Sequence, residues 1–73
     1  MPRLRPLSAD EVCRILEKHG FTIVRQKGSH IILRKEIEGR GITVPVPNHS
    51  EIAKGTLKSI IKQSEIPQSE FNR

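Results

Sequence analysis

The chain has 73 residues, the length of one small domain with a limited apolar core. Thirteen Lys and Arg residues outnumber eight Asp and Glu residues, and the formal net charge of +5 favours nucleic acid, or else an acidic protein, as the partner. The one cysteine excludes an internal disulfide bond and a cysteine zinc site, and no stretch has the length of a signal peptide or a membrane span. We therefore expect a single cytoplasmic domain over residues 1–73, with residues 1–7 as a basic lead-in.

The first predicted element is a helix from about Ala9 to His19. Ser8 and Glu11 have the spacing of a capping box, in which each side chain bonds the backbone N–H of the other residue. Apolar residues then recur at helical spacing, and Gly20 supplies the left-handed conformation that commonly follows a helix.

Three strands are expected next. The β-forming residues of 21–27 and 29–35 predict a hairpin that turns at Gly28. A glycine-containing turn over 36–41 leads to a short third strand over 42–44. We expect the two prolines that follow to stop this strand, because proline cannot donate a hydrogen bond to a sheet.

A second helix is predicted to begin at Lys54 or later, since Gly55 inside a helix costs about 1 kcal/mol relative to alanine. It should end near Ser64, and a short turn around Phe71 should follow. The order is then α-β-β-β-α, an α+β fold in which both helices cover one face of a three-stranded antiparallel sheet. This is the plan of the double-stranded-RNA-binding domain.

The candidate catalytic residue is His30. If Ile31 and Leu33 face the helices, the alternation of the second strand places His30 on the open face of the sheet. An imidazole can remove the proton of a ribose 2′-hydroxyl or protonate the leaving 5′-oxygen near neutral pH, so it can cleave RNA without a metal ion. A strand histidine on the surface without a function is the competing interpretation.

Four cationic side chains flank His30 in the sequence, and they would hold phosphates and stabilise the negative charge of a phosphorane. Alternatively, they form a solvated, charged sheet edge that deters aggregation. The four are Arg25, Lys27, Arg34 and Lys35. We favour Arg25 and Lys27 as RNA contacts because they are close to His30 along the chain.

The turn ahead of the strand contains Gly28 and Ser29. The glycine permits an unusual backbone conformation or a close approach, and the serine either bonds a phosphate or completes the turn. His49 is the other acid–base candidate, although a loop role ahead of the second helix is the competing interpretation.

Lys54, Lys58 and Lys62 recur every four residues along the second helix, where they would follow a phosphate backbone or form a solvated face. His19, beside the end of the first helix, and Cys13, on that helix, are expected to be structural. The three histidines lack the spacing of a metal site, so no metal cofactor is expected.

Several segments resemble the HicA family of toxin ribonucleases from bacterial toxin–antitoxin systems. They are Leu16-Glu17-Lys18-His19-Gly20-Phe21, Arg25-Gln26-Lys27-Gly28-Ser29-His30, Thr43-Val44-Pro45 with His49, and Gly55-Thr56-Leu57 with Ile60-Ile61-Lys62-Gln63. The resemblance extends from about Leu7 to Phe71, and it departs from the family pattern in the proline-rich segment 45–50.

The resemblance implies an endoribonuclease toxin with a double-stranded-RNA-binding-like fold, which cleaves mRNA without a metal ion and thereby arrests translation and growth. It places the catalytic histidine at His30 and the preceding glycine at Gly28. It also implies a HicB-type antitoxin as the neutralising partner, with the toxin monomeric alone and hetero-oligomeric with its antitoxin. The residues expected to bind RNA are Arg25, Lys27, Gly28, Ser29, Arg34 and Lys54.

Two other interpretations remain at this stage. A non-catalytic RNA-binding module of the same fold would bind RNA without cleaving it. A protein–protein adaptor would use its positive charge for an acidic partner alone and would have no salt-dependent affinity for RNA.

Overall fold

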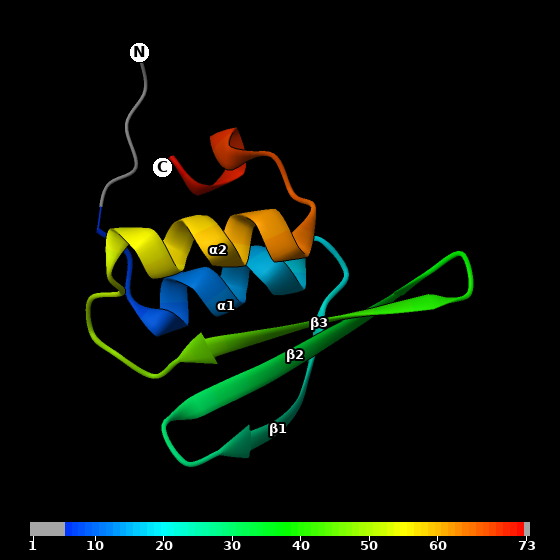
Figure 1. Cartoon of the computed structure of the whole chain (residues 1–73), viewed down its shortest axis with the longest axis horizontal. Helices are drawn as coiled ribbons and strands as arrows, with labels where there is room; N and C mark the ends of the chain where they lie inside the picture. Colours follow the sequence, from blue (N-terminus) through cyan, green and yellow to red (C-terminus); the bar gives the residue numbers. More distant parts are fainter. Residues whose placement is uncertain (1–5, 73) are drawn as a thin grey trace.

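Two helices cover one face of a three-stranded antiparallel sheet in the computed structural model, which describes residues 6–72 (Figure 1). Much of the predicted basic lead-in, residues 1–7, lies outside the described residues. None of the helices within 6–72 has the length and apolar character needed to cross a membrane. The elements are α1 (Ala9–Lys18), β1 (Thr22–Lys27), β2 (His30–Ile37), β3 (Arg40–Pro47), α2 (Lys54–Ser64) and a 3₁₀ helix η1 (Gln68–Phe71).

This element order confirms the predicted α-β-β-β-α fold, with strand order β1-β2-β3 in an open sheet. The capping box is present at the start of α1: the Ser8 N–H donates to Glu11 Oε1 at 3.0 Å, and the Glu11 N–H donates to Ser8 Oγ at 3.2 Å. The second helix begins at Lys54, as predicted from the cost of Gly55 within a helix.

The β1–β2 hairpin turns over two residues, because Lys27 pairs directly with His30. Gly28 has φ +58°, and Ser29 is not among the residues with positive φ. Positive φ at the first of the two turn residues, but not at the second, is the pattern of a type II′ turn. This turn type matches the twist of the flanking strands. The turn therefore needs glycine at position 28 for its backbone conformation.

The third strand is longer than predicted. We expected it to end before Pro45, but β3 continues to Pro47. The Asn48 N–H donates to the Ser29 carbonyl at 2.6 Å, so the alternate residues Val46 and Val44 direct their backbone groups to β2. The two proline nitrogens therefore lie on the free edge of the sheet, where no hydrogen bond is lost.

The buried face of the sheet is the one that the alternation predicted. Ile31 and Leu33 are buried against the helices, whereas His30 and Arg34 are exposed on the open face. Ile32 also points to the open face but is half-buried, because it pairs with Arg25 on one side and with Pro45 on the other. Ile42, Val44 and Val46 of β3 and the inner faces of both helices complete the core.

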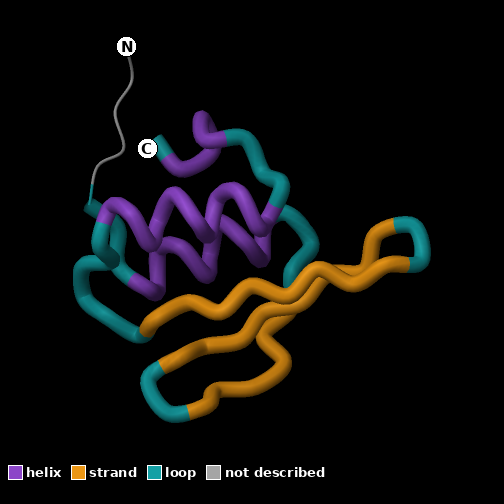
Figure 2. Tube along the Cα trace, viewed as in Figure 1, coloured by secondary structure: helices purple, strands orange, loops and turns teal. Residues whose placement is uncertain are grey.

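The β2–β3 hairpin extends well past the helix layer at its tip (Figure 2). Glu38 (φ 48°) and Gly39 (φ 82°) form this turn, and both are left-handed. Arg40 then returns toward the helices and binds Glu65 at the end of α2, with Nη–Oε distances of 2.9 and 3.1 Å. This ion pair lowers the pKa of the Glu65 carboxyl by hydrogen bonding and charge. The His30 end of the sheet is the opposite end of this hairpin.

Two glycine substitutions test the turn assignment. A Cβ atom would meet nothing within 4 Å at either Gly28 or Gly55, so only the backbone conformation distinguishes them. We expect Gly28→Ala to lower the free energy of unfolding by about 1 kcal/mol, because φ is positive there. Gly55→Ala, inside α2, should raise it by about 0.5–1 kcal/mol. Urea unfolding measures both, and changes of the same sign would contradict the assignment.

Candidate active site

His30 is the first residue of the central strand, directly after the tight turn. Its side chain is exposed on the open face, between its pairing partners Lys27 on β1 and Pro47 on β3. The predicted position of this imidazole is therefore confirmed, and solvent reaches it directly.

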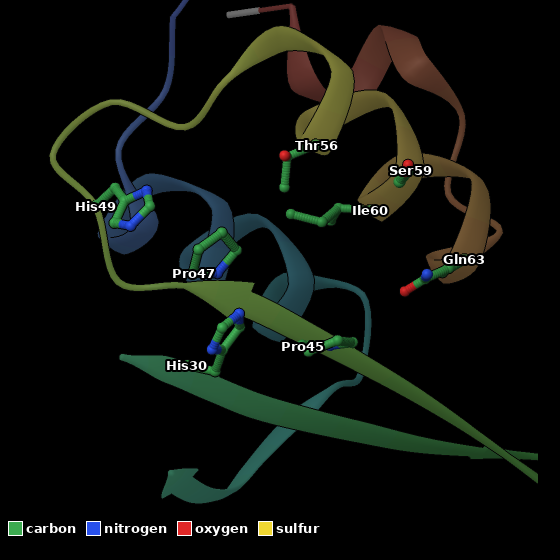
Figure 3. A pocket seen from close by; sticks show the side chains of 8 residues that line it. All are labelled: His30, Pro45, Pro47, His49, Thr56, Ser59, Ile60 and Gln63. Carbon is green, nitrogen blue, oxygen red and sulfur yellow. The ribbon is translucent and has the colours of Figure 1, made fainter. Parts of the chain in front are cut away.

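A pocket of about 380 Å³ lies along the edge of β3, between that strand and α2 (Figure 3). His30, Pro45, Pro47 and His49 form one side of it, and side chains of α2 form the other. The α2 residues are Thr56, Ser59, Ile60 and Gln63. The two histidines are the only titratable side chains among the residues that line this pocket.

The backbone around His49 is held on both sides, although the residue is exposed in a loop. Its N–H donates to the Pro47 carbonyl at 2.9 Å, and its carbonyl accepts the Ala9 N–H at the start of α1, also at 2.9 Å. That N–H belongs to the first turn of a helix, where it has no partner inside the helix. The loop conformation therefore positions His49 near the strand end that carries His30.

The charge near His30 is positive. Lys27 is its neighbour on β1, and Arg25 is the next residue of that strand to pair on the same face. Neither β1 nor β3 contains an acidic residue, and the first one on β2 is Glu36. Glu36 is six positions along the strand from His30, a separation of about 20 Å. A phosphate at His30 thus meets the cations of β1 with no carboxylate on the neighbouring stretch of the sheet.

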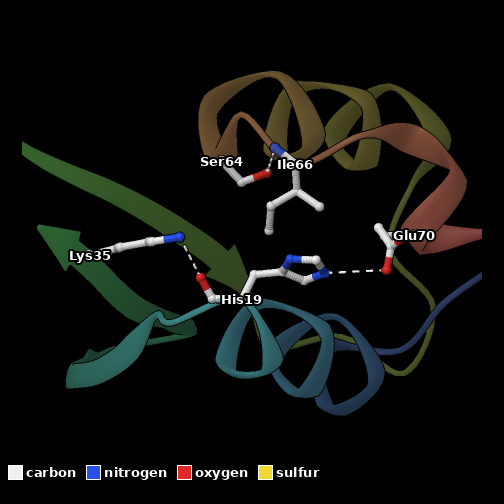
Figure 4. Close-up of polar contacts among 5 residues, drawn as sticks. All are labelled: His19, Lys35, Ser64, Ile66 and Glu70. Carbon is white, nitrogen blue, oxygen red and sulfur yellow. Dashed lines mark hydrogen bonds and ion pairs between the residues drawn. The ribbon is translucent and has the colours of Figure 1, made fainter. Parts of the chain in front are cut away.

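The other two flanking cations are engaged elsewhere. Arg34 lies on the open face, but its guanidinium binds Glu36 at 2.6 Å and Thr43 at 3.5 Å. Lys35 points to the helix layer, where its Nζ donates to the His19 carbonyl at 2.5 Å (Figure 4). The Lys35 ammonium also lies 5.8 Å from the centre of the Phe21 ring. The structure therefore brings Arg25 and Lys27, but not Lys35, to the side of His30.

Three further predicted residues are not among those that line the pocket. Gly28 and Ser29 are exposed in the turn before His30, and the Ser29 carbonyl binds the Asn48 N–H, which is a structural role. Lys54 is exposed in the first turn of α2, two residues before Thr56. That first turn has no side-chain cap and no acidic residue.

A family model described as HicA toxin of bacterial toxin–antitoxin matches residues 9–66. The chain belongs to the HicA toxin family. It is therefore a toxin of a toxin–antitoxin system, and the resemblance seen in the sequence is confirmed. A comparison with curated proteins gave no match.

The polar wall of the pocket in this HicA toxin was missed by sequence reasoning. Ser59 follows Thr56 by three residues and Gln63 follows Ser59 by four, so the three share one face of α2. This spacing is visible in the sequence, but the function of the helix was predicted from its lysines instead. In contrast, Lys58 and Lys62 are exposed and do not line the pocket.

The remaining histidine has a structural contact, as predicted. His19 Nε2 lies 3.3 Å from Glu70 Oε1, which connects the end of α1 to η1 outside the pocket (Figure 4). Within residues 6–72, no three His, Cys, Asp or Glu side chains come together in a way that could hold a metal ion.

Cys13 is buried on α1, and burial, followed by the charges of Glu17 and Asp10, raises the pKa of its thiol. We expect this thiol to be protonated and unreactive toward Ellman's reagent at pH 8, and to react fully once urea unfolds the toxin. Rapid labelling of the folded protein would contradict the buried, structural assignment.

Proposed function

We propose that this HicA toxin is an endoribonuclease that cleaves mRNA without a metal ion and thereby arrests translation and growth. The observation that carries the proposal is the pair of histidines, His30 and His49, on one pocket beside the cations of β1. Membership of the HicA toxin family supports the same activity.

The reaction needs two proton transfers. A neutral imidazole removes the proton of the ribose 2′-hydroxyl, and the 2′-oxygen attacks the adjacent phosphorus and forms a new P–O bond. The bond from phosphorus to the 5′-oxygen breaks, and an imidazolium gives its proton to that leaving oxygen. The products are a 2′,3′-cyclic phosphate and a 5′-hydroxyl, and proton exchange with water restores both histidines.

We assign these two transfers to His30 and His49 together. One histidine supplies only one of the two protonation states that the reaction needs at the same moment. No carboxylate, lysine or tyrosine is among the residues that line the pocket, so His49 is the available second group. Its backbone hydrogen bonds to Pro47 and Ala9 keep it in place before substrate arrives.

Charged groups on the elements next to the His49 loop lie outside the pocket lining. They are Asp10 and Glu11 on α1, Glu51 in the loop itself and Lys54 on α2. Glu11 is engaged in the capping box of α1. Because none of these groups lines the pocket, none of them replaces His49 as the second proton-transfer group.

Cations of the open face, together with Lys54 on α2, hold the RNA in this proposal. Lys27 and Arg25, next to His30, bind the scissile phosphate and stabilise the charge of the phosphorane. Lys54 on α2 binds the RNA backbone on one side of the scissile phosphate, and Arg34 binds it on the other side once a phosphate displaces Glu36 from its guanidinium. The turn of Gly28 and Ser29 lets the RNA approach closely. Many of these contacts are to phosphates, so affinity should fall steeply with added salt.

We further propose that a HicB-type antitoxin neutralises the toxin by covering the histidine-bearing face. The positive charge of β1 beside His30 supports an acidic contact surface on that partner. A small acidic protein encoded beside the toxin gene that abolishes RNA cleavage on binding would support this assignment. Cleavage that continues in the assembled complex would contradict it.

Replacing His30 distinguishes the nuclease from a non-catalytic RNA-binding module. We expect His30→Ala to lower the cleavage rate by about 10²–10⁴-fold, because one proton transfer loses its catalyst, while RNA affinity is retained. His19→Gln removes an imidazole outside the pocket and serves as the control, with a wild-type rate expected. Unchanged cleavage by His30→Ala would overturn the mechanism.

The pH dependence tests the role of His49. The wild-type kcat/KM should be bell-shaped, rising as the base loses its proton and falling as the acid loses its own. Replacing the base removes the rise at low pH, and replacing the acid removes the fall at high pH. We expect His49→Gln to lower the maximum rate by at least about 10²-fold and to eliminate one limb. A normal rate with both limbs intact would assign His49 to the loop alone.

A further inference from the structure

We propose that the pocket between β3 and α2 binds one unpaired nucleobase next to the scissile phosphate, and that Gln63 recognises the edge of that base. The pocket would then set the preferred cleavage sequence of the toxin. This inference rests on the proposed nuclease function and extends it to the choice of RNA site.

The polar groups of the pocket converge from one helix face. Thr56, Ser59 and Gln63 line it together and are drawn in Figure 3 on the wall opposite His30. Within residues 6–72 their side chains take part in no hydrogen bond, so their donors and acceptors are available to a ligand. The amide of Gln63 offers a carbonyl acceptor beside an NH₂ donor.

A nucleobase presents the complementary arrangement. Each base edge has a donor or an acceptor in adjacent positions, and a glutamine amide can bond two of them at once. A phosphate or a carboxylate would instead call for cations, and no lysine or arginine is among the residues that line the pocket. The uncharged polar wall therefore favours the base over the backbone.

The remaining walls are apolar and suit the faces of a flat ring. Pro45 and Pro47 lie on the strand side, and Ile60 lies on the helix side. Enzymes that bind an unpaired base hold it between apolar or aromatic side chains while polar groups recognise its edge. The volume of about 380 Å³ lies at the small end of the range for ligand pockets.

The location links this base to the reaction. His30 and His49 line the same pocket as Gln63, so a nucleotide whose phosphate reaches the histidines has its base within the pocket. A base inside a duplex is stacked and paired and cannot enter. Although the fold has the plan of a domain that binds double-stranded RNA, the pocket predicts a preference for unpaired RNA at the cleavage site.

Chimeric oligonucleotides provide the test. A single ribonucleotide within a DNA strand fixes the scissile bond, and the base on each side of that bond is varied among all four. We expect the purified wild-type toxin to prefer one base by about tenfold in kcat/KM at one of these two positions. Gln63→Leu, which keeps the size but removes the amide, should reduce that preference to about twofold. Gln68→Leu, on η1 outside the pocket, is the matched control and should retain it.

The outcomes separate this inference from the nuclease proposal. Cleavage by Gln63→Leu with unchanged base preference would overturn the inference and leave the nuclease intact. Loss of antitoxin binding by Gln63→Leu, again with unchanged base preference, would also overturn it and assign the pocket to the antitoxin. A wild-type toxin that cleaves neither the chimeras nor mRNA would reject the proposed function itself. Since Gln63 is exposed, the variant should unfold at the same urea concentration as the wild type.

Discussion

The pairing of β3 with β2 up to Pro47 is the constraint on which the pocket depends. The hydrogen bond from the Asn48 N–H to the Ser29 carbonyl ends this pairing beside the first residue of β2, which is His30. The chain then turns, and the Ala9 N–H at the start of α1 donates a hydrogen bond to the His49 carbonyl. Because these backbone contacts are made by strand, loop and helix together, both histidines adjoin the pocket before any ligand is present.

Charge is distributed unequally along the sheet, so its two ends differ in how much positive charge is left unpaired. On the half of the sheet toward the β2–β3 turn, Arg34 binds Glu36 and Arg40 binds Glu65, so positive charge is offset there. At the His30 end, Arg25 and Lys27 of β1 form no ion pair with any carboxylate of residues 6–72. This charge attracts a polyanion to the end of the sheet that carries His30, and the acidic antitoxin surface that we propose would be attracted to the same place.

Local signals in the sequence predicted most of the fold. The capping box at Ser8, the strand alternation around His30 and the cost of Gly55 each depend on neighbouring residues alone, and all three expectations were confirmed. The predicted end of β3 was wrong. Pro45 loses no hydrogen bond because it lies on the free edge of the sheet, and which strand forms that edge depends on the assembled fold. His49 remained ambiguous for a similar reason, since its partner Ala9 is 40 residues away in the sequence.

The central claim is that RNA occupies the pocket shared by the two histidines. Nuclear magnetic resonance of the labelled toxin tests it, with an unpaired oligonucleotide whose scissile ribose is replaced by deoxyribose so that it binds without being cleaved. The ring signals of His30 and His49 and the side-chain amide of Gln63 should shift together on binding, while the His19 ring should not. Binding that leaves the His30 and His49 rings unchanged would contradict the account.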